Sequence, residues 1–303
     1  MKKYLCGRKA LEYWGKMDVC DILGLDNKEE YVIFSESDFN RLPGDHWCRL
    51  TVAERYTENG VCTLPYLFLR YANELSLLKL IFLGMEICGI RDELKPLCTE
   101  RKIKSCAYSL KRHHGRNNAL KAVQFIQSRS YSPMESRLYM HLCLPNYLGG
   151  CGFPKAQLNY PITVGSKPYY LDLCFPEAKL AVEYDSYTYH SNAHSFSRDN
   201  IRSSKIETLG YRVIHVKPGQ LKKVDAYTDL VLNISRILQK PVYIRTDQFF
   251  EPFKELFCFF KPLAYEDIYL SDIPQFGGVS QAYQRYISER WPSQIATSYW
   301  RRY

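Results

Sequence analysis

The sequence predicts a mixed α/β protein with two domains and a C-terminal extension. Its 303 residues are about twice the length of a typical domain, and 46% of them are apolar, which excludes a mainly disordered chain. Apolar residues recur at helical spacing between 64 and 88, whereas three stretches between 156 and 185 alternate in polarity as strands do. We therefore expect domains at residues 1–130 and 131–240 and an extension at residues 241–303.

The first domain is expected to be an α/β module that ends in a basic helical tail. The apolar run at residues 31–34 predicts a short strand. The helical region at 64–88 begins with Pro65, a residue that suits the first turn of a helix, and Gly89 follows its end.

The basic tail, residues 101–130, carries eight Lys or Arg and two His but no Asp or Glu. The net charge of the whole chain is only +9, so the cations are concentrated here. Two interpretations fit this pattern: a solvated helical face or linker, or a surface that contacts phosphates and releases their counterions. In the second interpretation Arg112 and Arg116 are the candidate nucleic-acid-binding residues.

The cysteine pattern favours reduced thiols. The chain has eleven cysteines and no Cys-x-x-Cys pair. The nearest cluster, formed by Cys98, Cys106, His113 and His114, lacks the usual spacing of zinc ligands. We therefore expect most of the cysteines to be buried as small apolar side chains.

The second domain begins with a helix-start signal. Ser132 is the expected N-cap, Pro133 suits the first turn, and Glu135 completes a capping-box pattern. Short connections between the alternating stretches imply antiparallel neighbours. Strands are expected at 156–164, 169–175, 179–185 and 211–216, and helices at 195–209, stopped by Gly210, and at 224–238.

The extension is rich in Tyr, Phe, Trp and Pro. The spaced prolines prevent one long helix, and the aromatic residues are apolar enough to pack against the rest of the protein. We assign no chemistry to residues 241–303.

No membrane helix or secretion signal is expected. The most apolar stretch, residues 75–90, is interrupted by Lys79 and Glu86. The first residues are basic but lack the apolar core of a signal peptide. These features predict a cytoplasmic protein without a membrane partner.

Three carboxylates carry the strongest chemical signal. Asp172 lies on one predicted strand, and Glu183 and Asp185 lie on the next strand, where the alternation places both on the same face. Uncompensated burial of such a cluster costs several kcal/mol per charge. The carboxylates are therefore either exposed or paired with cations, for which Lys167, Lys179 and Arg212 are available, or they bind a hard divalent cation. Such a cation would polarise a phosphate oxygen and activate a bound water.

The arrangement of these acids resembles the PD-(D/E)XK nuclease superfamily, in which an Asp, a short turn and an apolar strand precede Glu-x-Lys. The closer similarity is to bacterial domains related to very-short-patch-repair endonucleases. It is carried, in matching order from about residue 130 to 238, by Ser132–Glu135, Asp172, Ala181–Ser186, His190, Arg198-Asp199, Arg202, Lys205 and Gly210–Ile214. The resemblance implies a restriction-endonuclease-like mixed sheet flanked by helices.

The resemblance also implies a role for each acid. Asp172 and Glu183 match the metal-binding acids, and the Tyr184 carbonyl matches a backbone ligand of Mg²⁺ or Mn²⁺. Asp185 stands where most of the superfamily has a water-orienting Lys. Glu135 matches a helix-borne acid that orients water or a second metal, although capping alone would also explain it.

The remaining matched residues are a histidine and a basic helix. His190 is the candidate for proton transfer in place of the missing Lys. Arg198, Arg202 and Lys205 recur at helical spacing and form a candidate phosphate-contacting face, the alternative being a solvated helix surface.

The expected function is that of a metal-dependent endonuclease cleaving DNA in phage defence or repair. The alternative is a non-catalytic nucleic-acid-binding regulator that retains the nuclease fold. A homodimer would suit a double-strand cut. Residues 60–65 show a looser similarity to a domain that precedes nuclease-like modules in abortive-infection and antitoxin-type proteins, so the N-terminal module resembles an antitoxin-like domain.

Overall fold

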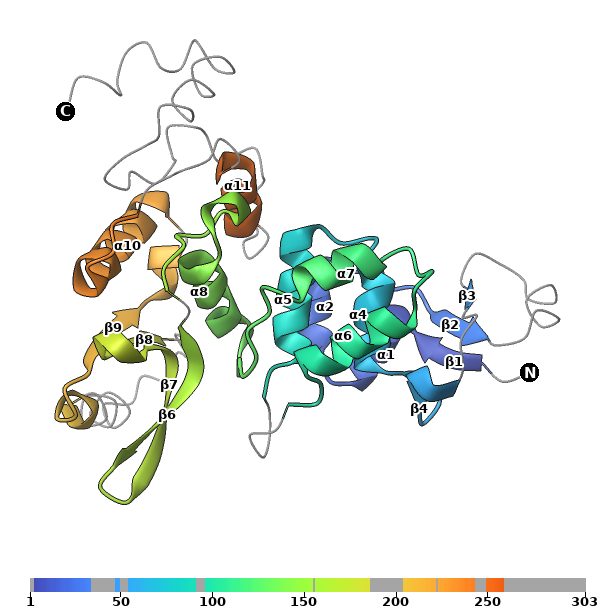
Figure 1. Ribbon diagram of the computed structural model, residues 1–303, viewed down its shortest axis with the longest axis horizontal. Helices are drawn as coiled ribbons and strands as arrows, with labels where there is room; N and C mark the ends of the chain where they lie inside the picture. Colours follow the sequence, from blue (N-terminus) through green and yellow to red (C-terminus); the bar gives the residue numbers. More distant parts are fainter. Residues whose placement is uncertain are drawn as a thin grey trace, which may run out of the picture. The chain divides into compact units, whose positions relative to one another are not determined.

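A computed structural model describes residues 3–33, 47–49, 54–90, 96–154, 156–185, 204–221, 223–242 and 249–258 (Figure 1). The chain divides into two compact units, Met1–Ser136 and Arg137–Tyr303. Each unit has helices and a mixed β-sheet, so the protein is of the mixed α/β class.

The sheet of the first unit has the strand order β3-β2-β1-β5-β4 in the described part of the chain. The central strand β1 (Lys3–Cys6) pairs antiparallel with β2 (Glu30–Ile33) and parallel with β5 (Val61–Cys62). The outer strands are β3 (Trp47–Arg49), parallel to β2, and β4 (Thr57–Glu58), antiparallel to β5. The strand predicted at residues 31–34 is β2.

The helical region predicted at residues 64–88 is interrupted. It forms α4 (Leu64–Tyr71) and α5 (Leu77–Ile87). Ser76 starts the second helix, because its hydroxyl accepts a 3.3 Å hydrogen bond from the Lys79 amide. The unit also contains α1 (Gly7–Tyr13) and α2 (Met17–Leu23).

Residues 101–130, the basic segment, contain most of two amphipathic helices. Helix α6 (Glu100–Ser109) begins at Thr99, whose hydroxyl accepts from the Lys102 amide at 3.3 Å. Helix α7 (Arg116–Ala122) follows after a short turn. Ile103, Cys106 and Ala107 are buried, so α6 uses one face for packing and leaves the other in solvent.

The second unit contains a four-stranded sheet in the order β6-β7-β8-β9. Its strands are β6 (Gln157–Val164), β7 (Lys167–Phe175), β8 (Leu180–Tyr184) and β9 (Arg212–Val216). The pairs β6–β7 and β7–β8 are antiparallel, as the short connections predicted, whereas β8–β9 is parallel. All four predicted strands are present.

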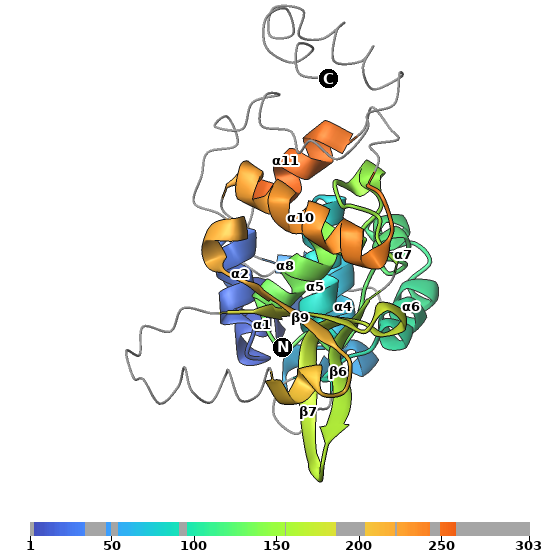
Figure 2. The same ribbon diagram turned by 90° about the vertical axis from the view of Figure 1, so that its left-hand side faces the viewer.

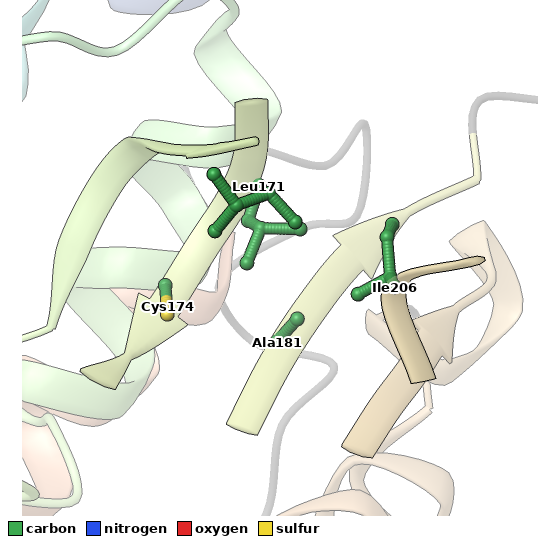
Figure 3. Close-up of a cluster of buried hydrophobic side chains, with 5 residues drawn as sticks. Leu171, Cys174, Ala181 and Ile206 are labelled. Carbon is green, nitrogen blue, oxygen red and sulfur yellow. The ribbon is translucent and has the colours of Figure 1, made fainter. Parts of the chain in front are cut away.

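Ile206 packs in a buried apolar cluster against strands of this sheet. The buried cluster consists of Ile162, Leu171, Cys174, Ala181 and Ile206. Figure 3 shows Ile206 approaching the sheet near Ala181 of β8. Residues 204–207 are helical, and Gly210, with a φ of 80°, follows them at the predicted stop. The earlier part of the predicted helix 195–209 lies outside the described residues.

The α-helices α8, α10 and α11 belong wholly or largely to this unit. Helix α8 (Pro133–Cys143) follows the predicted capping box, and α10 (Val224–Leu238) has the predicted bounds. Helix α11 (Phe250–Cys258) belongs to the extension (Figure 2). Its Phe253 and Phe257 rings lie 5.9 and 6.0 Å from the ring of Tyr227 on α10, so this part of the extension packs on the unit as expected.

The described residues also show the state of the cysteines and the character of the helices. The ten cysteines whose side chains are described form no disulfide, and nine of them are buried. Among these same ranges, no helix combines the length and the apolar character needed to cross a bilayer.

Candidate active site

The two predicted metal-binding acids meet where the pairing of β7 with β8 ends. The ladder runs from the pair Phe175–Leu180 to the pair Leu173–Val182. Beyond it, the Tyr184 amide donates to Oδ2 of Asp172 at 2.9 Å, and the Asp172 amide donates to Oε1 of Glu183 at 3.3 Å. Each carboxylate thus reaches the backbone of the opposite strand, and Asp172 and Glu183 lie side by side as predicted.

The sheet is irregular on the other side of Asp172 as well. The register of β6 with β7 passes from Leu158–Leu173 to Tyr160–Leu171, without a pair between Asn159 and Asp172. Asn159 is buried and has a φ of 46°, in the left-handed region that Asn tolerates better than most residues. Asp172 therefore lies at a gap in the β6–β7 ladder and just beyond the end of the β7–β8 ladder. Such backbone irregularities recur at functional sites.

Burial makes the hydrogen bonds to these acids important. Only 7% of Glu183 is exposed, and Asp172 is half-buried. Removing a carboxylate from water is costly, and hydrogen bonds from backbone amides offset part of that cost. Of the cations considered as alternative partners, Lys179 donates to the Leu209 carbonyl at 3.1 Å.

The third acid, Asp185, forms a pair with a histidine that the sequence did not single out. The parallel register places Glu183 opposite His215, and the Asp185 amide donates to the Val216 carbonyl at 3.0 Å. Nδ1 of His215 then lies 3.1 Å from Oδ1 of Asp185. Both side chains are accessible, with 40% of His215 and 46% of Asp185 exposed. The sequence signal that could have identified His215 was its position in the strand predicted at 211–216.

Tyr184, whose carbonyl is the predicted third metal ligand, follows Glu183 on β8. Burial raises the pKa of its phenol, and the nearby Arg137 guanidinium opposes that rise. Arg137 itself is buried on α8 and donates to the Leu221 carbonyl at 2.6 Å. Burial lowers the pKa of Arg137 to about 10, against the opposing effect of Tyr184 and Tyr227. The hydrogen bond of this buried cation joins α8 to the segment that follows β9.

Glu135 forms the predicted capping box. Its Oε2 accepts from the Tyr131 amide at 2.8 Å, and its Oε1 accepts from the Ser132 hydroxyl at 3.0 Å. The Glu135 amide donates in return to the Ser132 hydroxyl at 3.3 Å. Only 6% of Glu135 is exposed. The cap therefore explains this residue structurally, and its catalytic role stays a prediction.

The predicted basic residues divide into three groups. Arg112 is exposed after α6. Arg116 is half-buried, and its Nε donates to the Ala107 carbonyl at 3.1 Å, so it also supports the local fold. Lys205 is exposed. His190, Arg198 and Arg202 lie outside the described residues, and their roles stay predictions.

The donor chemistry of Asp172 and Glu183 fits a hard divalent cation. Mg²⁺ prefers oxygen ligands and is commonly held by one or two carboxylates while it keeps several waters. Within the part of the chain that the structure describes, no group of three or more His, Cys, Asp and Glu side chains is placed to hold a metal. The binding of a cation by these two carboxylates and the Tyr184 carbonyl stays a prediction.

Comparison with known proteins adds two relatives. Uncharacterized protein Rv2248 and Uncharacterized protein MT2308, both of Mycobacterium tuberculosis, are each 26% identical to this chain over 132 residues. The similar region is 41% of this chain and 46% of each relative, so the chain spans less than half the length of these relatives. No protein-family model matches the chain. No solved structure matches it either.

Proposed function

We propose that this protein is a divalent-metal-dependent endonuclease that hydrolyses phosphodiester bonds in DNA. The observation that supports this most directly is the pairing of Asp172 and Glu183 at the end of β8, where each carboxylate is bound to a backbone amide of the facing strand. The resemblance of the flanking motifs to restriction-endonuclease-like domains supports the same reaction and the same fold.

In this proposal Asp172, Glu183 and the Tyr184 carbonyl would hold Mg²⁺ or Mn²⁺. When bound, such a cation would polarise a phosphate oxygen and lower the pKa of a bound water. The chain's own contribution is preorganisation. Hydrogen bonds from the backbone amides fix both carboxylates in one geometry before substrate arrives.

Proton transfer is assigned to histidine. Asp185 occupies the position of the usual Lys, and its carboxylate orients the His215 ring through the 3.1 Å contact at Nδ1. A carboxylate at one ring nitrogen favours a tautomer that can accept a proton at Nε2. His215 therefore joins His190 as a candidate for taking a proton from the attacking water.

Substrate binding is assigned to the basic segment and to the basic helix predicted at residues 195–209. Clustered cations neutralise phosphates without reading sequence, which suits an enzyme that must hold the DNA backbone. The residues assigned to this role are Arg112, Arg116, Arg198, Arg202 and Lys205. We place the activity in the cytoplasm, in phage defence or repair, with a homodimer for double-strand cuts.

One observation favours a second candidate function. Asp185 replaces a cation that helps position water in most of the superfamily, and it is engaged with His215. A protein that kept the fold and the DNA contacts but lost this cation would act as a non-catalytic nucleic-acid-binding regulator.

The two candidates differ in their response to metal. Supercoiled plasmid, DNA oligonucleotides and RNA would be incubated with the full chain in Mg²⁺, in Mn²⁺ and in EDTA. The nuclease is expected to nick or linearise DNA only with a divalent cation. Binding to DNA without cleavage in either metal, and without calorimetric uptake of Mn²⁺ when DNA is present, would instead support the regulator.

A further inference from the structure

Helix α6 presents a line of two cations and one aromatic ring to solvent. Arg101, Lys104 and Tyr108 are spaced at i, i+3 and i+7, which places them on one side of a helix. All three are exposed, and Tyr108 is 57% exposed. The opposite side of the helix carries the buried residues Ile103 and Cys106. The line therefore takes no part in the packing of α6.

The Tyr108 ring is held beside a fixed positive charge. The Arg116 guanidinium lies 5.7 Å from the centroid of the Tyr108 ring, within the range of a cation–π contact. Its Nε donates to the Ala107 carbonyl, so α7 anchors the guanidinium next to the ring. Lys111 and Arg112 are exposed in the turn between the two helices. Residues 101–130 include no acid, and the one acid of α6 is its first residue, Glu100.

An exposed aromatic ring among cations fits single-stranded nucleic acid better than a duplex. Cations alone are sufficient to bind duplex phosphates. In a duplex the bases are stacked on each other, so their faces are not open to a side chain on a convex helix. A single strand offers unpaired bases that stack on aromatic side chains, while neighbouring cations bind its backbone.

We propose that Arg101, Lys104, Tyr108 and Arg116 bind single-stranded DNA, with an unpaired base stacked on Tyr108. We name these four residues, three on α6 and Arg116 on the neighbouring α7, the α6 stripe. The choice of DNA rests on the proposed function; the stacking itself rests on the geometry of α6 and α7. The nuclease would then act on single strands, or on duplexes with an unpaired segment that the α6 stripe captures.

Binding can be measured apart from cleavage. Fluorescence anisotropy of the full chain in EDTA would compare a labelled single-stranded DNA, its matched duplex and the same strand as RNA. We expect single-stranded DNA to bind most tightly. Tyr108→Ala should weaken that binding roughly tenfold or more, the size of one lost base stack. Tyr108→Phe should retain it, because the ring is kept.

Tyr131→Ala is the matched control, since Tyr131 is also 57% exposed but is not part of the α6 stripe. Its affinity for single-stranded DNA should equal that of the unchanged protein. Circular dichroism and urea unfolding of each variant would check that the helix content and the stability of the chain are kept. Unchanged affinity of a folded Tyr108→Ala variant, an equal loss on the duplex, or tighter binding of RNA would each overturn the proposal. If binding depends on Tyr108 but no metal-dependent cleavage is found, this inference stands. Only the proposed nuclease activity is then refuted.

Discussion

The amide nitrogen of Tyr184 donates a 2.9 Å hydrogen bond to Oδ2 of Asp172. This bond continues the contact between β7 and β8 past the point at which their backbone ladder ends. Asp172 thus has a structural role and a proposed metal-binding role in the same carboxylate. The two roles make different demands, because the hydrogen bond needs only an acceptor oxygen whereas the cation needs the negative charge.

Asp172→Asn is therefore expected to separate the roles. The side-chain amide retains an oxygen that can accept from Tyr184, so the fold should be kept, while Mn²⁺ binding and cleavage should be lost. Asp172→Ala should also lower the free energy of unfolding by roughly 1–3 kcal/mol, because the Tyr184 amide loses its acceptor. Isothermal calorimetry with Mn²⁺, plasmid cleavage and urea unfolding would measure the three effects.

Glu177→Gln is the control for this substitution. Glu177 is an exposed acid on the turn η3 (Pro176–Ala178) between the same two strands, so its loss should leave cleavage and stability unchanged. Cleavage by the folded Asp172→Asn variant at the rate of the unchanged protein would contradict the proposed metal site.

Local signals in the sequence predicted the start of helix α8 and much of the second unit. The capping box at Ser132 and Glu135 forms as expected because its hydrogen bonds join residues only three or four apart. The strands around Asp172 and Glu183 also follow from alternation and short turns, which place neighbouring strands side by side without long-range information.

The parts that were missed depend on long-range register. His215 meets Asp185 only because β9 pairs in parallel with β8, and thirty residues separate the two side chains in sequence. The interruption of the sheet at Asn159 likewise depends on the left-handed backbone of one residue. The break between α4 and α5 was missed because the apolar spacing continues across it, although Ser76 supplies an N-cap.

His215→Ala is expected to slow cleavage by roughly 10²–10⁴-fold, the usual range for loss of a proton-transfer group. Mn²⁺ binding should stay near normal, since His215 is not among the proposed ligands. His215→Asn can still donate to Asp185 but cannot accept a proton as imidazole does, so it should be equally slow. His190→Ala, assayed in parallel, would show which histidine dominates. Cleavage by His215→Asn as fast as by the unchanged protein would assign the contact with Asp185 to structure alone.

Glu135→Ala is expected to destabilise the protein. Its two carboxylate oxygens accept from Tyr131 and Ser132, and the loss of such a buried cap costs about 1–2 kcal/mol. Glu135→Gln keeps an acceptor for the cap and should be nearly as stable as the unchanged protein. If Glu135 acts only in the cap, Glu135→Gln should also cleave normally; loss of cleavage in this stable variant would establish its catalytic role.

Arg112→Ala tests the basic segment with little risk to the fold, because Arg112 is exposed whereas Arg116 is bonded to Ala107. Removing one phosphate contact should flatten the dependence of log affinity on log salt by about 0.7 for a single strand. The matched control is Lys28→Ala, an exposed cation that pairs with Asp26 elsewhere in the same unit. Equal salt slopes for the two variants would identify the segment as a solvated face.

His113 introduces a pH dependence into the first unit. Burial is the main cause that lowers the pKa of His113, and the nearby charges of His114 and Arg70 lower it further. The Gly115 amide donates to Nδ1 of His113 at 3.2 Å, a bond that requires this nitrogen to be unprotonated. The ring also meets Tyr66 edge-on, with 6.1 Å between the ring centroids.

The folded state is therefore expected to lose stability as the pH falls below neutrality. Because the pKa of His113 is lower in the folded chain than in the unfolded chain, the unfolded chain binds more protons between the two values, and stability falls as the pH drops through about 6.5. The loss should level off below the lowered pKa, and its slope cannot exceed about 1.4 kcal/mol per pH unit, the limit for one proton.

His113→Asn keeps an acceptor for the Gly115 amide but does not titrate, so its urea midpoint should vary less between pH 7.5 and pH 5 on this account. His114→Asn, which alters the exposed neighbour, should retain most of the pH dependence. Identical pH profiles for His113→Asn and the unchanged protein would show that the acid sensitivity arises at other groups.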